Sequence, residues 1–303
     1  MKIFISEIIS YLSSDLLNYY GNIDEVYVDN VADVSHLTPS SLDWVNTRKT
    51  DTQQCAENSV ARVLLASPAV RFSKEMEKKQ KVLLIVEKPR MAMAKIIQYF
   101  FVEKKESGIS PAAFVNQQAQ IGTNVYIGPG CVIGNATIGN NTIINPNVVV
   151  YDDVIIGNNC IIQAGAVLGT DGLGCSRESD GKLVKFPHIG KLIIGNDVEI
   201  GANCQIAKGV LSDTVIENGC KINGLCFIAH NCHLAENVWI TGDTMLCGST
   251  SVGKNTTIYS NVIIREQVKI GTNSTIGMGS VVTKNVPNDE IWLGSPAHFH
   301  SKK

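Results

Sequence analysis

A six-residue spacing of aliphatic residues dominates the second half of this chain. The spacing runs without exception through Ile222, Ile228, Leu234, Ile240, Leu246, Val252, Ile258, Ile264, Ile270, Ile276 and Val282. A period of six fits neither an amphipathic helix nor an alternating strand. It is typical of a solenoid in which each six-residue step forms one flat side of a parallel β-helix, with three steps to a coil. The chain is therefore predicted to be dominated by β-structure.

The same spacing divides the chain into parts. The repeat begins with Ile121, Ile127 and Ile133, and we predict a β-helix over residues 114–285 and a capping tail over 286–303. Residues 169–188 (GTDGLGCSRESDGKLVKFPH) break the spacing and are rich in glycine and charge. We expect them to form an external loop, which in solenoids commonly lies over the working face. Residues 106–113 are small and polar with one proline, which predicts a linker.

Residues 1–105 lack the repeat and are predicted to form a small α/β domain. We expect a helix over about 5–19, followed by strands over 25–34, 61–66 and 81–86. A second helix is expected from Pro89 to Phe101, since proline is tolerated in the first turn of a helix.

Composition and charge argue against several classes of protein. The net charge is −2, and no basic stripe interleaved with aromatic residues is present, so nucleic-acid binding is not expected. No apolar run reaches the length of a membrane span, and the N-terminus is typical of an amphipathic helix, not a signal peptide. We therefore expect a cytoplasmic protein without a membrane span.

The cysteines follow the repeat. Six of the nine lie four residues after a ladder position: Cys131, Cys160, Cys204, Cys220, Cys226 and Cys232. Valine, threonine, serine and alanine occupy that position elsewhere, so these cysteines are expected to be small buried hydrophobes with free thiols in a reducing compartment.

Several motifs carry a family resemblance. These are Gly169-Thr-Asp-Gly-Leu-Gly174, Ile194-Gly-Asn-Asp-Val-Glu-Ile-Gly-Ala-Asn203, Asp213-Thr-Val-Ile216 and Ile228-Ala-His-Asn231. In this order they resemble the UDP-3-O-acylglucosamine N-acyltransferases of lipid A synthesis, over residues 25 to 296 or so. The resemblance implies a left-handed parallel β-helix and a homotrimer with its sites in clefts between subunits. It also implies acyl transfer from acyl carrier protein or acyl-CoA to the amine of a nucleotide-linked amino sugar, with no tightly bound cofactor and no metal.

The resemblance implies that His230 is the general base and that the Gly248 N–H binds the oxyanion. The repeat supports the pairing independently, because these two residues are eighteen positions, or one coil, apart. Such positions stack about 5 Å from each other. A histidine can accept the proton of an amine near neutral pH.

Further binding residues are expected, the first three of them from the same resemblance. Trp44 and Asn46 in the first domain are assigned to the nucleotide, and Gln267 is aligned with a second histidine of the family. Asp171, His188 and Asn223 are candidates for contacts with the acceptor. Gly248 and Lys302 are candidates for contacts with the donor.

Two alternatives stay open. The segment Val286-Pro…Gly-Ser-Pro-Ala297, followed by lysines, resembles coenzyme A-dependent hexapeptide acetyltransferases. This favours a short-chain acyl-CoA (acetyl-CoA)-dependent N-acyltransferase for O-antigen or capsule sugars. The other alternative is a non-catalytic or metal-binding β-helix protein. His230 and His233 could serve as zinc ligands, but the repeat directs Cys232 between them into the core, which argues against a metal site.

Overall fold

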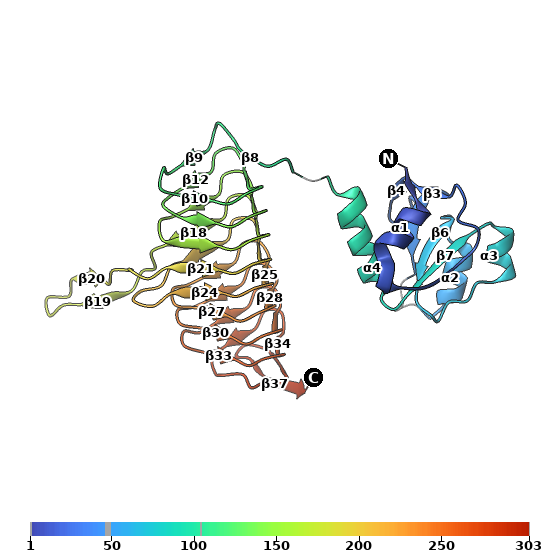
Figure 1. The fold of residues 1–303 in the computed structure, drawn as a ribbon. Coiled ribbons are helices and arrows are strands. Elements are labelled where there is room, and N and C mark those ends of the chain that lie inside the picture. Colours follow the sequence, from blue (N-terminus) through green and yellow to red (C-terminus); the bar gives the residue numbers. More distant parts are fainter. Residues whose placement is uncertain (1, 46–49, 104, 303) are drawn as a thin grey trace. The chain divides into compact units, whose positions relative to one another are not determined.

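The computed structural model describes residues 2–45, 50–103 and 105–302. The chain divides into two compact units, Met1–Lys104 and Lys105–Lys303, and each has its own hydrophobic core (Figure 1).

The C-terminal unit is a parallel β-helix with three sheets, which we name by their number of strands. The eight-stranded sheet contains β10 (Gln120–Ile121), β13 (Thr137–Ile138), β16 (Val154–Ile156), β21 (Leu192–Ile194), β24 (Thr214–Ile216), β27 (His233–Leu234), β30 (Ser251–Val252) and β33 (Lys269–Ile270). The nine-stranded sheet contains β9 (Phe114–Val115), β12 (Val132–Ile133), β15 (Val149–Val150), β18 (Val167–Thr170), β23 (Gln205–Ala207), β26 (Phe227–Ile228), β29 (Met245–Leu246), β32 (Ile263–Ile264) and β35 (Val281–Val282). The eleven-stranded sheet contains β8 (Gly108–Ile109), β11 (Tyr126–Ile127), β14 (Ile143–Ile144), β17 (Ile161–Ile162), β22 (Glu199–Ile200), β25 (Lys221–Ile222), β28 (Trp239–Ile240), β31 (Thr257–Ile258), β34 (Thr275–Ile276), β36 (Glu290–Leu293) and β37 (His298–Lys302).

The aliphatic ladder forms the core of the β-helix. Ile228 pairs with Leu246, and Leu246 pairs with Ile264, so residues one coil apart stack in register. All three side chains are fully buried. The six cysteines of the repeat are buried in the same core, and each is a free thiol. The predicted β-helix and the predicted role of these cysteines are therefore confirmed.

An external hairpin interrupts the β-helix where the sequence breaks the repeat. β18 runs on to Thr170, and the chain then leaves the coil and forms β19 (Cys175–Arg177) and β20 (Leu183–Lys185), an antiparallel pair. Figure 1 shows this arm projecting from one side of the stack of coils. The predicted external loop is confirmed, although its strands were not foreseen. We call residues 171–188 the hairpin arm.

The two ends of the β-helix differ from the expected boundaries. Gly108–Ile109 already pair with Tyr126–Ile127, so the predicted linker over 106–113 is wrong and contains the first strand. The strand has a single apolar residue, Ile109, which is too few to reveal the six-residue spacing in the sequence. In the tail, β36 pairs with β34 and β37 folds back on β36, while Ala297 is buried. The tail therefore packs against the last coil.

The N-terminal unit is a five-stranded sheet with helices. Its strand order is β2 (Leu16–Tyr20), β7 (Val82–Val86), β6 (Val63–Ala66), β5 (Ser41–Trp44) and β4 (Asn30–Val31), and β1 (Ile3–Phe4) pairs separately with β3 (Tyr27–Val28). Its helices are α1 (Ile5–Leu12), α2 (Thr52–Asn58), α3 (Lys74–Lys78) and α4 (Pro89–Ile96), with a 3₁₀ turn over Ser13–Asp15 and a π-helical turn over Ile97–Phe101.

Several expected elements of this unit need correction. The helix predicted over 5–19 ends at Leu12, because Ser13 has a positive φ of 41° and Leu16–Tyr20 pair with β7 instead. The strand predicted over 25–34 is two short strands, and β5, α2 and α3 were not foreseen. The strands near 61–66 and 81–86 and the helix beginning at Pro89 are confirmed.

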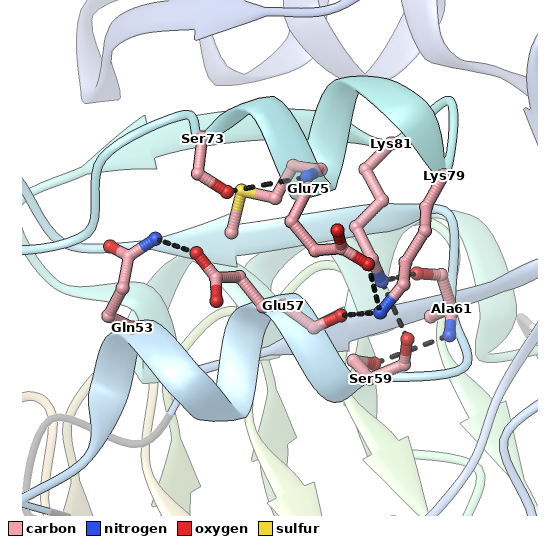
Figure 2. Close-up of polar contacts among 9 residues, drawn as sticks. Gln53, Glu57, Ser59, Ala61, Ser73, Glu75, Lys79 and Lys81 are labelled. Carbon is pink, nitrogen blue, oxygen red and sulfur yellow. Dashed lines mark hydrogen bonds and ion pairs between the residues drawn. The ribbon is translucent and has the colours of Figure 1, made fainter.

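A buried lysine joins two segments of this unit (Figure 2). Lys81 Nζ donates to the carbonyl oxygens of Ser59 (2.6 Å) and Ala61 (2.8 Å), just before β6. Burial lowers the pKa of Lys81. Beside it, Lys79 Nζ donates to the carbonyl of Glu57 at 3.0 Å. These bonds satisfy carbonyl groups that no sheet partner reaches, so the lysines act structurally here.

Candidate active site

His230 lies at the corner where the chain passes from the nine-stranded to the eight-stranded sheet. It follows β26, and Gly248 occupies the equivalent position one coil later, after β29. A Cβ added to Gly248 would lie 2.8 Å from His230 Cε1 and 2.9 Å from Nε2. The imidazole therefore rests directly against Gly248, and only glycine leaves room for it. The structure brings together the two residues that the coil length predicts to stack.

Asn231 fixes the orientation and tautomer of His230. Its Nδ2 donates to the Ser212 carbonyl at 2.7 Å, and its Oδ1 accepts from the Val210 N–H at 3.1 Å. The amide can satisfy both partners in only one orientation. The same Oδ1 lies 2.9 Å from His230 Nδ1, which must therefore carry a proton and donate. In the neutral ring the lone pair is then on Nε2, the nitrogen beside Gly248.

The Gly248 amide is available beside this ring. At the same corner the Ser249 N–H donates to the His230 carbonyl, and the Gln267 N–H donates to the Gly248 carbonyl, both at 2.9 Å. Among the residues that the structure describes, no hydrogen-bond acceptor pairs with the Gly248 N–H. A backbone N–H in this state can bind a developing oxyanion.

A second imidazole from the hairpin arm packs against the first. The rings of His188 and His230 are 5.3 Å apart and inclined at 80°. His188 is only 5% exposed, and its Nδ1 bonds to the Phe186 carbonyl at 3.0 Å. A Cβ on Gly172 would lie 2.7 Å from His188 Nε2 and 2.9 Å from His230 Cδ2. The base of the hairpin arm therefore covers both imidazoles.

Asp171 lies at the base of the same arm. Its carboxylate bonds to Lys185 Nζ at 2.6 Å and lies 3.8 Å from Lys208 Nζ. The hydrogen bond from Lys185 holds the pKa of Asp171 below its usual value, with a smaller contribution from Lys208. Lys208 shares the corner of His230, since Ile206 pairs with Ile228. Asp171 thus ties the arm to the corner.

Gln267 lies at the same corner of the β-helix as His230, one residue beyond the column of that histidine. Its φ of 62° matches those of Asn231 (59°) and Ser249 (60°), so these three residues stack at the corner. Counting one coil on from Gly248, the residue in line with His230 is Glu266, which is exposed. The equivalence of Gln267 with a histidine of the family stays a prediction.

Asn223 lies at a different corner from His230. It follows β25 of the eleven-stranded sheet, whereas His230 follows β26 of the nine-stranded sheet. Asn223 lines a cavity of about 440 Å³ with Lys221, Trp239 and Thr241. Asn223 and His230 therefore lie on different sides of the coil within one subunit, because successive six-residue steps face different directions.

The remaining candidates lie elsewhere. Trp44 ends β5, is half-buried and lines a cavity of about 480 Å³ in the N-terminal unit. Asn46 lies outside the described residues. Lys302 is exposed on β37 at the last coil, paired with Glu290, and the structure does not bring it beside His230.

Neither a metal centre nor a cysteine nucleophile is suggested by this corner. His233 Nε2 lies 2.7 Å from Glu217 Oε1 on the eight-stranded sheet, while His230 bonds to Asn231. No cluster of three or more potential metal ligands occurs in residues 2–45, 50–103 and 105–302. Burial raises the pKa of Cys247, next to Gly248, and that of Cys232 to about 12, which disfavours reactive thiolates.

Two residues of this arrangement were not assigned from the sequence. Asn231 belongs to the Ile228–Asn231 motif. Its role, however, depends on hydrogen bonds with Val210 and Ser212, which lie in the connection between β23 and β24. Gly172 belongs to the glycine-rich start of the hairpin arm, and its contact with both imidazoles depends on how the arm returns. For Asn231, the sequence signal was an asparagine that directly follows a histidine at a corner of the coil.

Comparison with known proteins agrees with this architecture. The family model for the bacterial transferase hexapeptide (six repeats) matches residues 135–170 and 249–284. The chain carries hexapeptide repeats in both matched segments. In the part that the structure describes, it has no helix with the length and apolar character needed to cross a bilayer.

Curated relatives match this chain over a limited stretch. It is 56% identical over 71 residues to the UDP-3-O-acylglucosamine N-acyltransferase of Coxiella burnetii (strain Dugway 5J108-111), which is 23% of this chain and 21% of that protein. The protein of the same name from Dechloromonas aromatica (strain RCB) is 53% identical over 70 residues, 23% and 20% of the two chains. The chain thus spans about a fifth of the length of the curated relatives it matches.

Solved structures match over a longer region. LpxA from Acinetobacter baumannii is 28% identical, with a TM-score of 0.58 over 64% of this chain and 74% of that one. UDP-N-acetylglucosamine O-acyltransferase (LpxA) from Moraxella catarrhalis RH4 is 24% identical, with a TM-score of 0.59 over 64% and 74%, and supports the fold alone.

Proposed function

We propose that this protein is an N-acyltransferase that moves an acyl group from a thioester to the amine of a nucleotide-linked amino sugar. The single observation that carries the proposal is the position of His230 Nε2, the ring nitrogen that does not bond to Asn231, against Gly248. The names of the relatives, UDP-3-O-acylglucosamine N-acyltransferase, supply the acceptor class.

The reaction needs no covalent enzyme intermediate. The acceptor amine attacks the thioester carbonyl, and His230 Nε2 takes the proton that the amine loses. The Gly248 N–H donates to the resulting oxyanion, a contact worth about 3 kcal/mol in comparable sites. As the tetrahedral intermediate collapses, the C–S bond breaks and the imidazolium returns its proton to the leaving thiolate. An amide and a free thiol result.

The donor is proposed to be acyl carrier protein or acyl-CoA, and the cavity beside Trp44 is proposed for the nucleotide base, which an indole can stack against. Since acyl thioesters of both kinds are cytoplasmic, so is the proposed reaction.

A direct assay tests the proposal. Purified protein is incubated with UDP-3-O-acylglucosamine and either 3-hydroxyacyl carrier protein or acetyl-CoA. The masses of the products are then measured by mass spectrometry. An N-acylated sugar formed with either donor supports the proposal, and the preferred donor separates long-chain from short-chain transfer. No amide product with either donor, at any of several pH values, contradicts it.

We also propose that the active form is a homotrimer. The outward-facing residues of the nine-stranded sheet are largely apolar: Val132, Val149, Val167, Phe227, Met245, Ile263 and Val281. Of these, Val132, Met245 and Ile263 are more than 40% exposed in the single chain. An apolar face of this kind, interrupted by Gln205 between Val167 and Phe227, favours burial between subunits. It adjoins the corner of His230, so a neighbouring subunit would complete the walls of the site.

Replacing Ile263 with lysine should therefore separate the subunits. Burying an unpaired ammonium group in an apolar interface costs several kcal/mol. Light scattering after size-exclusion chromatography should show trimers for the wild type and monomers for Ile263→Lys. The control is Thr257→Lys, which adds the same charge to the outward side of the eleven-stranded sheet. A trimeric mass for Ile263→Lys would place the interface elsewhere.

Replacing Asn231 with aspartate should change the pH dependence of the reaction. A carboxylate beside His230 Nδ1 stabilises the imidazolium, so the protonated form persists to higher pH. We expect the acidic limb of kcat/KM to move upward by about one pH unit. Asn237→Asp is the matched control, because Asn237 is an exposed residue with a similar φ of 58°. An unchanged profile for Asn231→Asp would remove Asn231 from the control of the base.

A further inference from the structure

The most unusual atom of the hairpin arm is Nε2 of His188. Within the part of the chain that the structure describes, it is the only buried side-chain nitrogen or oxygen without a hydrogen-bond partner. Buried polar atoms in native proteins are nearly always satisfied, and an exception calls for a functional explanation. This atom belongs to the ring that packs directly on the imidazole of His230, the proposed base.

The chemistry of Nε2 is set by the other ring nitrogen. Nδ1 lies 3.0 Å from the Phe186 carbonyl oxygen, which can only accept a hydrogen bond. Nδ1 therefore carries the proton, and Nε2 of the neutral ring is an acceptor. The group that satisfies it must be a donor, and for a sugar or a hydroxylated acyl chain that donor is a hydroxyl.

We propose that His188 is a substrate-binding residue whose Nε2 accepts a hydrogen bond from a substrate hydroxyl next to the reacting amine. The inference rests on the proposed function for the identity of the substrates. With the two rings 5.3 Å apart, an amine and a hydroxyl separated by a few bonds can reach one imidazole each. The hydroxyl belongs either to the acceptor sugar or to a 3-hydroxyacyl chain of the donor.

Gly172 connects this contact to the hairpin arm. It packs so closely that a Cβ added to it would lie 2.7 Å from His188 Nε2. A bound hydroxyl takes this place, so the start of the arm moves aside when substrate enters. The arm is held at this point by Asp171 with Lys185 and Lys208, which are ion pairs that can rearrange without loss of core packing.

Binding measurements without turnover test the proposal. Calorimetry compares the wild type, His188→Leu and His188→Gln for binding of UDP-3-O-acylglucosamine alone and of a non-hydrolysable 3-hydroxyacyl-CoA analogue alone. We expect His188→Leu to weaken one of the two ligands about tenfold, the size of one hydrogen bond. His188→Gln keeps an acceptor oxygen and should recover most of the affinity. His233→Leu is the control on the outer face of the eight-stranded sheet.

Modified ligands identify the source of the hydroxyl. If it is a sugar hydroxyl, a deoxy acceptor lacking it should lose about tenfold in affinity for the wild type and nothing for His188→Leu. If it is the acyl hydroxyl, only the wild type should discriminate between 3-hydroxyacyl and unsubstituted acyl analogues. Equal losses for all ligands in His188→Leu, or no loss for any, would overturn the proposal.

The test separates this inference from the proposed function. Thermal unfolding of both His188 variants first establishes that they are folded. The ¹⁵N resonance of His188 Nε2 in the wild type should then shift on addition of the ligand, without any catalysis. A protein that binds one of the two ligands through His188 but forms no amide would contradict N-acyl transfer and leave the His188 contact intact. A resonance that does not respond to a bound ligand would overturn the contact itself.

Discussion

Replacing His230 with alanine is expected to lower kcat at least a hundredfold while the fold and subunit mass stay the same. His230 is the residue whose unprotonated nitrogen faces Gly248, and loss of a general base costs about 10²- to 10⁴-fold in rate. Turnover is measured with saturating acceptor and donor, and circular dichroism verifies the fold. The control is His233→Ala, three residues further on at the outer face of the eight-stranded sheet. Near-normal turnover of His230→Ala would exclude His230 as the base.

Replacing Gly248 with alanine is expected to reduce kcat about a hundredfold by a different route. The new methyl group would stand 2.8 Å from Cε1 and 2.9 Å from Nε2 of His230, so the ring must leave its position. The backbone N–H remains, and the loss therefore measures displacement of the base. Gly174→Ala is the matched control, because a Cβ there meets nothing within 4 Å.

A double-mutant cycle checks this explanation. In the His230→Ala protein the imidazole is absent, so Gly248→Ala has no ring to displace and should cost little more. The two losses should be strongly non-additive, as is usual for residues in contact. Additive losses would mean that Gly248→Ala acts on the backbone of the corner and not through His230.

The β-helix could be predicted from the sequence because its information is local and periodic. Once a coil has three six-residue steps, residues such as His230 and Gly248 must stack, whatever the rest of the chain does. The same counting identifies Glu266, one residue before Gln267, as the next residue in that column. It also shows that Asn223, one step and one residue before His230, ends a different side of the coil.

The hairpin arm and the N-terminal unit could not be predicted in this way. The contact between His188 and His230 depends on how the arm returns to the coil, and no repeat describes that path. In the N-terminal unit, Leu16–Tyr20 continues an apolar pattern begun by a helix, yet its pairing with β7 makes it a strand. Tertiary pairing overrides local propensity in such short segments.

The pairing on both sides of the hairpin arm has an evolutionary consequence. β16 pairs with β21, and β18 with β23, across the departure of the arm, so the coils before and after it stay in register. An insertion held this way can lengthen, shorten or change sequence without disturbing the scaffold beneath. Descendants of such a chain can therefore acquire new acceptors by altering the arm while inheriting the reaction chemistry of the corner unchanged.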